Sequence, residues 1–264
     1  DSAVCQTLHH DFEQLKQVEV LEQGVSKENI SEYNTMPAIN NDYLQALARS
    51  VLTAIDTHSN VQVPKCLDLG CSVGGLSFLL AKHATFIDAL DFSARFIQHG
   101  VKLQQGETVR YVTNREGDLV NFHEYSLPKA LLEESKNILF SQGDICNLKA
   151  IFTGYDVIVA QNVLQQSYDP KLFLKQVDQR LNTNGLLIII TDYDFEEQIT
   201  DKSKWLGGQK INGENVTGFE ALSENLFDKF ILRNKQSLTQ VYQMSQRKFT
   251  VKQPQLTVWQ LKNE

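Results

Sequence analysis

The stretch from residue 65 to residue 93 constrains the fold more than any other part of the chain. An apolar run at 65–69 leads into the glycine turn Gly70-Cys71-Ser72-Val73-Gly74, which is followed by a helix-like segment at 74–82 and a second apolar run at 86–91. Short apolar runs that alternate with helical periodicity are typical of a βαβ unit with parallel strands. The stretch therefore predicts a parallel α/β sheet whose first strand ends at a glycine turn.

The same alternation continues over the rest of the chain. It predicts helices at 94–105, 170–181 and about 218–230, and strands at 138–142, 155–160, 186–191, 237–244 and 255–261. Together with the apolar runs at 65–69 and 86–91, these make seven strands. The first five, up to 186–191, are expected to be parallel, and the last two are expected to close the sheet as an antiparallel pair. The fold class is therefore α/β, a doubly wound Rossmann-like sheet of seven strands.

The domain organisation follows from what this sheet leaves over. Residues 1–60 are predicted to be a helical lead-in that acts as a lid, with an apolar-periodic helix at 42–55 and a break at Asn40-Asn41 that could cap it. Residues 61–264 form the main domain, with insertions at about 106–136 and 192–217. Long insertions in a compact α/β domain usually carry binding loops, so substrate specificity is expected there.

Composition excludes several classes of partner. The formal net charge of −7 and the scattered Lys and Arg residues argue against nucleic acid. No apolar run approaches the roughly 20 residues that span a bilayer, so we expect no membrane partner and a cytoplasmic location. The four cysteines form no CxxC pair and have no His at ligand spacing, so no metal is expected.

Polar residues at two strand ends predict a nucleotide-containing cofactor. Gly70 and Gly74 allow backbone N–H groups to approach a ligand, and Asp68 offers a carboxylate to a cationic amine. Asp91 ends the second strand about 20 residues after the glycines, at the position that binds ribose hydroxyls in nucleotide-binding folds. Cys71 and Ser72 lie inside the turn and belong to the same predicted site.

Two further strand ends extend this site. Gly143-Asp144-Ile145 follows the third strand, where Asp144 would accept from an adenine amino group and Ile145 would pack on the ring. Gln161-Asn162 follows the fourth strand and would face a transferable methyl group. Read without their neighbours, the first segment is an ordinary solvent-facing turn and the second a helix cap. Together the signals favour S-adenosylmethionine as the cofactor.

Three other classes of function compete with this interpretation. A dinucleotide site would need G-x-G-x-x-G, but Ser72 occupies the middle position. The same turn matches the G-x-S-x-G nucleophile elbow of hydrolases, yet no strand precedes it and no His follows His123 to complete a triad. A non-catalytic binding module stays open, although it gives no reason for the three carboxylates Asp68, Asp91 and Asp144.

The chain from about residue 32 onward resembles the methyltransferase of ovothiol biosynthesis, the mercaptohistidine N-methyltransferase. The resemblance is carried by the runs at 67–74, 91–98, 142–148, 152–156, 205–208 and 256–259, of which Asp91-Phe92-Ser93-Ala94-Arg95-Phe96-Ile97 and Trp205-Leu206-Gly207-Gly208 are not shared by methyltransferases in general. It implies a class I fold, and methyl transfer from S-adenosylmethionine to a ring nitrogen of 5-thiohistidine. The products would be ovothiol A and S-adenosylhomocysteine.

The resemblance adds partners and site residues. Its family often forms the C-terminal domain of 5-histidylcysteine sulfoxide synthase, which implies that enzyme as a partner or fusion. Phe92 and Arg95 join the predicted cofactor-binding residues. The sequence departs from the family at Thr191-Asp192-Tyr193-Asp194, where a Ser-Pro-aromatic run is usual, and after Tyr33. Both departures lie where an acceptor is expected, so a different small-molecule acceptor stays open.

Methyl transfer from a sulfonium is an in-line displacement, so positioning matters more than a strong base. We therefore predict Asn162, Asp192 and Tyr193 as the catalytic positioners. The predicted substrate-binding residues, which include two of these, are Tyr33, Asn162, Tyr168, Tyr193 and Trp205. Trp205 could equally be ordinary packing, and Asp192 could be a solvated turn residue.

Overall fold

The computed structural model describes residues 2–22 and 42–263 of the 264-residue chain. The helices are α1 (Ser2–Glu22), α2 (Tyr43–His58), α3 (Gly75–Leu80), α4 (Ala94–Gln104), α5 (Lys129–Glu134), α6 (Pro170–Gln176) and α7 (Gly218–Leu226). The strands are β1 (Lys65–Leu69), β2 (Phe86–Asp91), β3 (Val109–Glu116), β4 (Leu119–Tyr125), β5 (Ile138–Gln142), β6 (Tyr155–Gln161), β7 (Leu181–Thr191), β8 (Gln209–Ile211), β9 (Glu214–Val216), β10 (Phe230–Ser237), β11 (Gln240–Ser245), β12 (Lys248–Lys252) and β13 (Gln255–Leu261).

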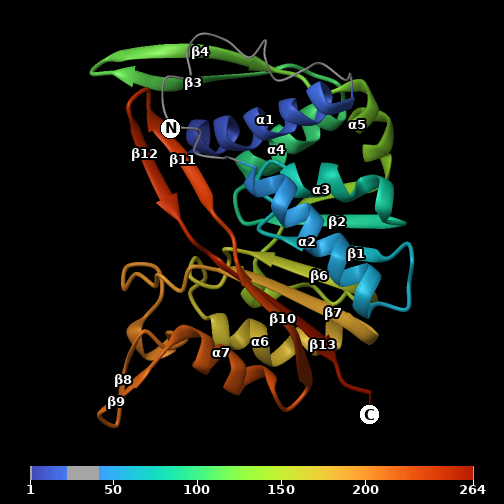
Figure 1. Cartoon of the computed structure of the whole chain (residues 1–264), viewed down its shortest axis with the longest axis vertical. Helices are drawn as coiled ribbons and strands as arrows, with labels where there is room; N and C mark the ends of the chain where they lie inside the picture. Colours follow the sequence, from blue (N-terminus) through green and yellow to red (C-terminus); the bar gives the residue numbers. More distant parts are fainter. Residues whose placement is uncertain (1, 23–41, 264) are drawn as a thin grey trace.

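A seven-stranded sheet in the order β10-β13-β7-β6-β1-β2-β5 forms the centre of the molecule (Figure 1). The strands β1, β2, β5, β6 and β7 are parallel, and β13 runs antiparallel to both of its neighbours. The predicted doubly wound sheet of seven strands is thereby confirmed. The chain winds outward from β1 through β2 to β5 and then returns to β6, so the strand order reverses between β1 and β6. Open α/β sheets bind their ligands at such a point.

The two faces of the sheet carry separate apolar cores. Strand residues alternate between the faces, so Cys66 of β1 packs towards α1 to α5, and Leu67 and Leu69 pack towards α6 and α7. The central strands read as continuous apolar runs because both of their faces are covered. Trp259 of β13 is fully buried on the α6–α7 face.

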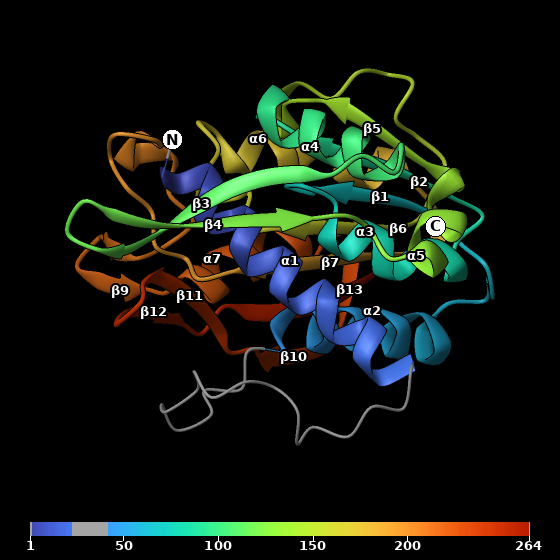
Figure 2. The same ribbon diagram turned by 90° about the horizontal axis from the view of Figure 1, so that it is seen from above.

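The two N-terminal helices pack on the body of the protein. The buried face of α2, which includes Leu47 and Val51, lies in the core with α3 and β7. In α1, Phe12 stacks on Tyr125 of β4 with ring centroids 4.3 Å apart. Both views place α1 beside the β3–β4 hairpin (Figures 1 and 2). The predicted cap at Asn40-Asn41 lies outside the described residues, and α2 begins after Asp42.

One closing strand was predicted at the wrong residues. The partner of β13 is β10 (Phe230–Ser237), whereas most of the stretch predicted as a sheet strand, 237–244, belongs to β11, which pairs with β12 in a separate hairpin. The antiparallel closing pair itself is confirmed. β10 is an edge strand with mostly exposed polar side chains, so it lacks the apolar run by which the inner strands are found in the sequence.

Helix ends and insertions also differ from the sequence pattern. The helices predicted at 170–181 and 218–230 end at Gln176 and Leu226, and the first continues as a 3₁₀ turn over Val177–Arg180. The insertion at about 106–136 holds the β3–β4 hairpin and α5, and that at 192–217 holds the small β8–β9 hairpin. Within the described ranges, every helix is too short or too polar to cross a membrane.

Candidate functional site

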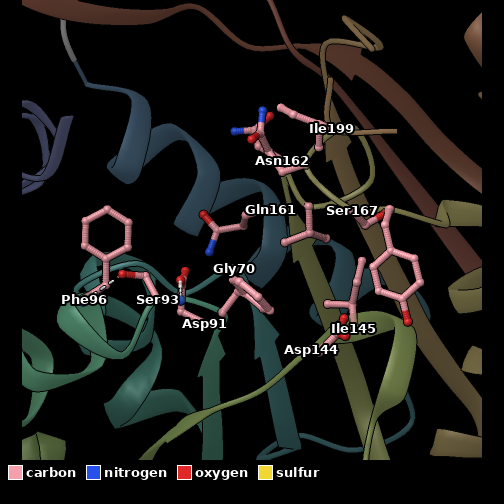
Figure 3. A pocket seen from close by; sticks show the side chains of 14 residues that line it. Gly70, Asp91, Ser93, Phe96, Asp144, Ile145, Gln161, Asn162, Ser167 and Ile199 are labelled. Carbon is pink, nitrogen blue, oxygen red and sulfur yellow. Dashed lines mark hydrogen bonds between the residues drawn. The ribbon is translucent and has the colours of Figure 1, made fainter. Parts of the chain in front are cut away.

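A cavity of about 500 Å³ opens at the carboxyl ends of β1, β2, β5 and β6, where the strand order reverses (Figure 3). Its volume lies within the range of small-molecule binding sites. The lining residues are Gly70, Asp91, Phe92, Ser93, Phe96, Asp144, Ile145, Gln161, Asn162, Val163, Gln166, Ser167, Tyr168 and Ile199. The cavity thus collects eight of the predicted site residues from four strand ends that are distant in the sequence.

The glycine turn after β1 forms one wall of this cavity. Gly70 has φ +75°, and a Cβ atom at this position would lie 2.6 Å from the carbonyl oxygen of Gln161 and 2.4 Å from Cγ1 of Val163. The backbone N–H groups of Gly70 and Cys71 both donate to the carbonyl of Leu90, which ties the turn to the end of β2. Only glycine meets both the conformational and the steric requirement here.

Asp91 links the glycine turn to the next helix. Its Oδ2 accepts from the Ser72 N–H at 3.0 Å, and its Oδ1 accepts from the Ser93 N–H at 2.8 Å. Burial raises the pKa of this carboxyl above its ordinary value, and the two N–H donors partly offset that effect. The carboxylate is thus fixed at the cavity wall, at the sheet edge where ribose hydroxyls bind in nucleotide-binding folds.

The other wall comes from the segments that follow β5 and β6. Asp144 is oriented by a hydrogen bond from the Cys146 N–H to its Oδ1 at 2.9 Å, and Ile145 lines the cavity beside it. Asn162 has φ +51°, and its Oδ1 accepts from Gln165 Nε2 at 3.2 Å. Figure 3 shows Asn162 at the upper edge of the site and Asp144 at the lower edge. The cavity therefore presents a carboxylate at one end and a carboxamide at the other.

Several of the predicted cofactor residues do not line the cavity. Asp68, Cys71, Ser72, Gly74, Arg95 and Gly143 are outside the lining. Gly74 approaches Phe140, and Gly143 donates its N–H to the Asp91 carbonyl. Cys71 is buried, and burial raises the pKa of its thiol well above the usual value. A buried thiol of this kind is inert and serves as packing.

Asp68 supports Gln161, and its carboxylate makes no contact with the cavity. Its Oδ1 accepts from Gln161 Nε2 and its Oδ2 from the Ser77 hydroxyl, both at 2.7 Å. The side chain is fully enclosed, and burial raises its pKa to about 6, although the two hydrogen bonds act in the opposite direction. Asp68 thus fixes the Gln161 side chain, which does line the cavity.

The raised pKa of Asp68 predicts how the stability of the protein depends on pH. A carboxyl whose pKa is higher in the folded than in the unfolded state contributes stability below its unfolded pKa, and that contribution is lost as the pH rises through the folded value. For Asp68 the window runs from the ordinary 3.8 to about 6. Asp68→Asn should remove the cost of the buried charge, up to about 3 kcal/mol above pH 6 for about two pKa units.

Thermal unfolding of Asp68→Asn and the unchanged protein between pH 4.5 and 8 checks this. The melting temperature of the variant should exceed that of the unchanged protein at pH 8, and the two should converge towards pH 4.5. The Ser77 hydroxyl can accept from the new amide, so the hydrogen bonds are replaceable. A variant that is equally destabilised at every pH would contradict the expectation.

The predicted acceptor residues are spread more widely. Asn162 and Tyr168 line the cavity, whereas Asp192, Tyr193 and Trp205 do not, and Tyr33 lies outside the described residues. Asp192 binds Lys252 Nζ at 2.8 Å.

Tyr193 and Trp205 each have a protein partner. The Tyr193 hydroxyl donates to Oε1 of Gln255 at 3.0 Å. Trp205 donates from Nε1 to the Thr200 carbonyl and stacks on Phe195. These contacts order the segment after β7, which contributes Ile199 to the cavity.

The lining also contains residues that sequence reasoning did not single out. Ser93 and Phe96 lie in the run 91–97, so the position of this run in the sequence could have identified them as lining residues. Gln166, Ser167 and Ile199 follow no recognisable pattern, because they reach the cavity only through the path of their loops. Ser72, the candidate nucleophile of the hydrolase alternative, has a buried hydroxyl without a hydrogen-bond partner among the described residues, so it has no base.

The sheet order and the cavity at its reversal point define a class I S-adenosylmethionine-dependent methyltransferase. The chain belongs to the methyltransferase domain family, which it matches over residues 62–246. No curated protein sequence matches the chain. The predicted fold and enzyme class are thereby confirmed.

Solved structures share the fold at low sequence identity. The N-methyltransferase NodS from Bradyrhizobium japonicum WM9 has a TM-score of 0.54 at 14% identity, over 85% of this chain and 99% of NodS. NodS in complex with S-adenosyl-L-homocysteine gives 0.51 at 14%, over 96% and 100%. The PH0226 protein from Pyrococcus horikoshii OT3 gives 0.52 at 16%, over 87% and 98%. The [4+2]-cyclase SpnF gives 0.53 at 12%, over 83% of each chain.

Proposed function

We propose that the protein transfers a methyl group from S-adenosylmethionine to an imidazole ring nitrogen of 5-thiohistidine, giving ovothiol A and S-adenosylhomocysteine. The observation that carries this proposal is the position of the run 91–97. Asp91, Phe92, Ser93 and Phe96 from this run all line the cavity. The segment by which the chain resembles the thiohistidine methyltransferases thus contributes directly to the ligand site.

The residues of the cavity fit the cofactor. The missing side chain at Gly70 leaves a wall formed by backbone, and Asp91 presents a fixed carboxylate to hydroxyl donors. Asp144 and Ile145 at the other wall suit the amino group and the face of an adenine. When bound, the cofactor supplies an electrophilic methyl group on a sulfonium. Likewise, NodS has been crystallised with S-adenosyl-L-homocysteine in the same fold.

The residues of the chain position the acceptor. A neutral imidazole nitrogen already carries a lone pair, so the site has to select the tautomer and orient the ring, and a strong base is not required. Asn162 offers a carboxamide at the cavity edge, and its Oδ1 is held by Gln165. The ring loses its remaining N–H proton to solvent after transfer. Tyr168, half exposed at the same cavity, covers part of the opening.

A panel of acceptors tests the proposal. Release of S-adenosylhomocysteine should be at least tenfold faster with 5-thiohistidine than with histidine, because a site that pairs the sulfur penalises an analogue that lacks it. Mass spectrometry should place the methyl group on a ring nitrogen. Binding of S-adenosylhomocysteine, followed by calorimetry, is the control for an intact cofactor site.

Three results would overturn the proposal in different ways. Equal rates with histidine, or a methyl group on sulfur or the α-amine, would exclude this acceptor chemistry. Turnover only with unrelated amines or carboxylates would assign a different small-molecule methyltransferase. Cofactor binding without any turnover would indicate a non-catalytic module.

We also propose that the protein works beside a 5-histidylcysteine sulfoxide synthase, as a separate protein or as part of a fusion. Such a partner would supply the thiolated imidazole. The proposal is supported by the sequence resemblance described above.

A further inference from the structure

A buried group of polar side chains adjoins the cavity at Asn162 and has no role in the cofactor site. We call His10, Asp11, Tyr43 and Tyr242 the tyrosine cluster. The His10 ring stacks on Tyr242 with centroids 4.5 Å apart and lies 5.9 Å from the ring of Tyr43. Asn162 lines the cavity and also interacts with the phenol of Tyr43. The cluster therefore lies next to the carboxamide end of the cavity, although its four residues are not part of the cavity lining.

The His10 ring is held between Gln14 and Asp11. Gln14 Oε1 accepts from the Leu44 N–H at 2.6 Å, which fixes the orientation of the Gln14 amide. Its NH₂ group donates to the His10 carbonyl at 3.1 Å and lies 3.0 Å from Nε2 and 3.4 Å from Nδ1 of the His10 ring. On its other side, Nδ1 of His10 lies 2.9 Å from Asp11 Oδ1. The His10 ring thus occupies one oxygen of the Asp11 carboxylate.

Asp11 has a second carboxylate oxygen, Oδ2, that accepts no hydrogen bond from the described residues. The residue is 6% exposed, and among the described residues its one ion-pair partner by distance is His10, on Oδ1. A buried carboxylate favours a cationic partner because its charge is poorly solvated. Asp192, a second carboxylate near the cluster, is already paired with Lys252. Asp11 is thus the carboxylate of this region that is able to receive a cationic ligand group.

The two phenols are free to donate hydrogen bonds. Tyr43 is 2% exposed, and its hydroxyl has no hydrogen-bond partner of normal geometry among the described residues. Burial raises the pKa of this phenol, chiefly through desolvation and through neighbouring Tyr242, so it stays protonated. The Tyr242 oxygen accepts from Gln240 Nε2 at 2.7 Å, which leaves its own proton available. An unpartnered buried hydroxyl is costly unless a ligand completes it.

We propose that the tyrosine cluster is the acceptor-recognition site, in which Tyr43 and Tyr242 hydrogen-bond a flat heteroaromatic ring and Asp11 binds an ammonium group. The ligand class is a small amino acid with a ring acceptor, since aromatic faces beside a carboxylate suit such a cation. This inference rests on the proposed methyl transfer. Because the cluster adjoins Asn162, at the edge of the cavity opposite Asp144, it serves the acceptor and leaves the nucleoside end to Asp91 and Asp144.

Conservative variants separate this role from a structural one. Tyr43→Phe and Tyr242→Phe keep the ring packing and remove only the hydroxyl. Each should raise KM for 5-thiohistidine by about tenfold, the value of one buried hydrogen bond, with the dissociation constant of S-adenosylhomocysteine changed less than twofold. Tyr111→Phe is the matched control, because Tyr111 also packs on α1 but bonds His9 away from the cavity. It should leave KM unchanged.

The ammonium assignment has its own test. Asp11→Asn should lower the preference for 5-thiohistidine over its analogue without the α-amine by about tenfold, because the charged partner is lost. The inference would be overturned by an unchanged KM in both phenylalanine variants, or by weaker cofactor binding with an unchanged KM. In either case, turnover of 5-thiohistidine by the unchanged enzyme would leave the proposed function intact. Failure of the unchanged enzyme to bind S-adenosylhomocysteine would instead reject the proposed function.

Discussion

Gly70→Ala should abolish measurable binding of S-adenosylmethionine and S-adenosylhomocysteine. The new methyl group would lie 2.6 Å from the backbone oxygen of Gln161 and 2.4 Å from Val163 Cγ1, and the residue has φ +75°. Real Cβ atoms do not approach backbone so closely, so the end of β1 must separate from the end of β6. Because both strand ends form the cavity wall, we expect at least about a thousandfold loss of affinity, corresponding to about 4 kcal/mol.

A substitution at a second glycine separates the effect of steric collision from the effect of backbone strain. Gly213 has φ +90°, but a Cβ atom there would meet nothing within 4 Å. Gly213→Ala should therefore cost stability through its backbone conformation alone and leave cofactor affinity unchanged. Calorimetry and thermal unfolding of both variants check this. Equal affinities for Gly70→Ala and the unchanged protein would mean that the turn after β1 does not contact the cofactor.

Asp91→Ala should weaken the binding of S-adenosylhomocysteine by about 10- to 100-fold. The carboxylate lines the cavity and is held by the N–H groups of Ser72 and Ser93. Its removal deletes the expected ribose contacts, worth about 1.5–3 kcal/mol for charged hydrogen bonds, and releases the glycine turn from α4. Affinity should fall for both the methylated and the demethylated cofactor, because the sulfonium takes no part in this contact.

Asp156→Ala is the control for lost structure. Asp156 also accepts two hydrogen bonds, from the Lys65 N–H and from Asn182 Nδ2, both at 2.8 Å. It lies at the opposite end of the parallel strands, away from the cavity. Both variants should lower the melting temperature, and only Asp91→Ala should change the dissociation constant. A comparable loss of affinity in both would attribute the effect to stability.

The sheet could be read from the sequence wherever both faces of a strand are covered. The apolar runs at 65–69, 86–91 and 155–160 correspond to β1, β2 and β6 because a strand buried on both faces needs continuous apolar residues. The edge strand β10 escaped prediction for the same reason. The side chains of Arg233, Asn234 and Lys235 in this strand are exposed to solvent. Its sequence therefore lacks the apolar periodicity by which a strand is recognised.

The cavity was predictable to the extent that it is built from strand ends. Parallel strands bring their carboxyl ends to one edge, so residues directly after β1, β2, β5 and β6 had to converge there. This placed Gly70, Asp91, Asp144 and Asn162 together. Asp68 lies on β1 itself, two residues before the turn, and packs against Ser77 of α3 instead. Whether a residue near a strand end faces the cavity depends on the path of the chain in three dimensions. The spacing of residues in the sequence does not determine it.

The sequence by itself determined the order of elements, the parallel sheet, the glycine turn and the cofactor edge, because each depends on short-range periodicity or on conformations that only a few residues adopt. Only the tertiary structure decided how the N-terminal helices and the β11 strand meet beside Asn162. His10, Tyr43 and Tyr242 come together from three distant parts of the chain. Their contact is set by the packing of α1 against α2 and β11, for which no local pattern exists.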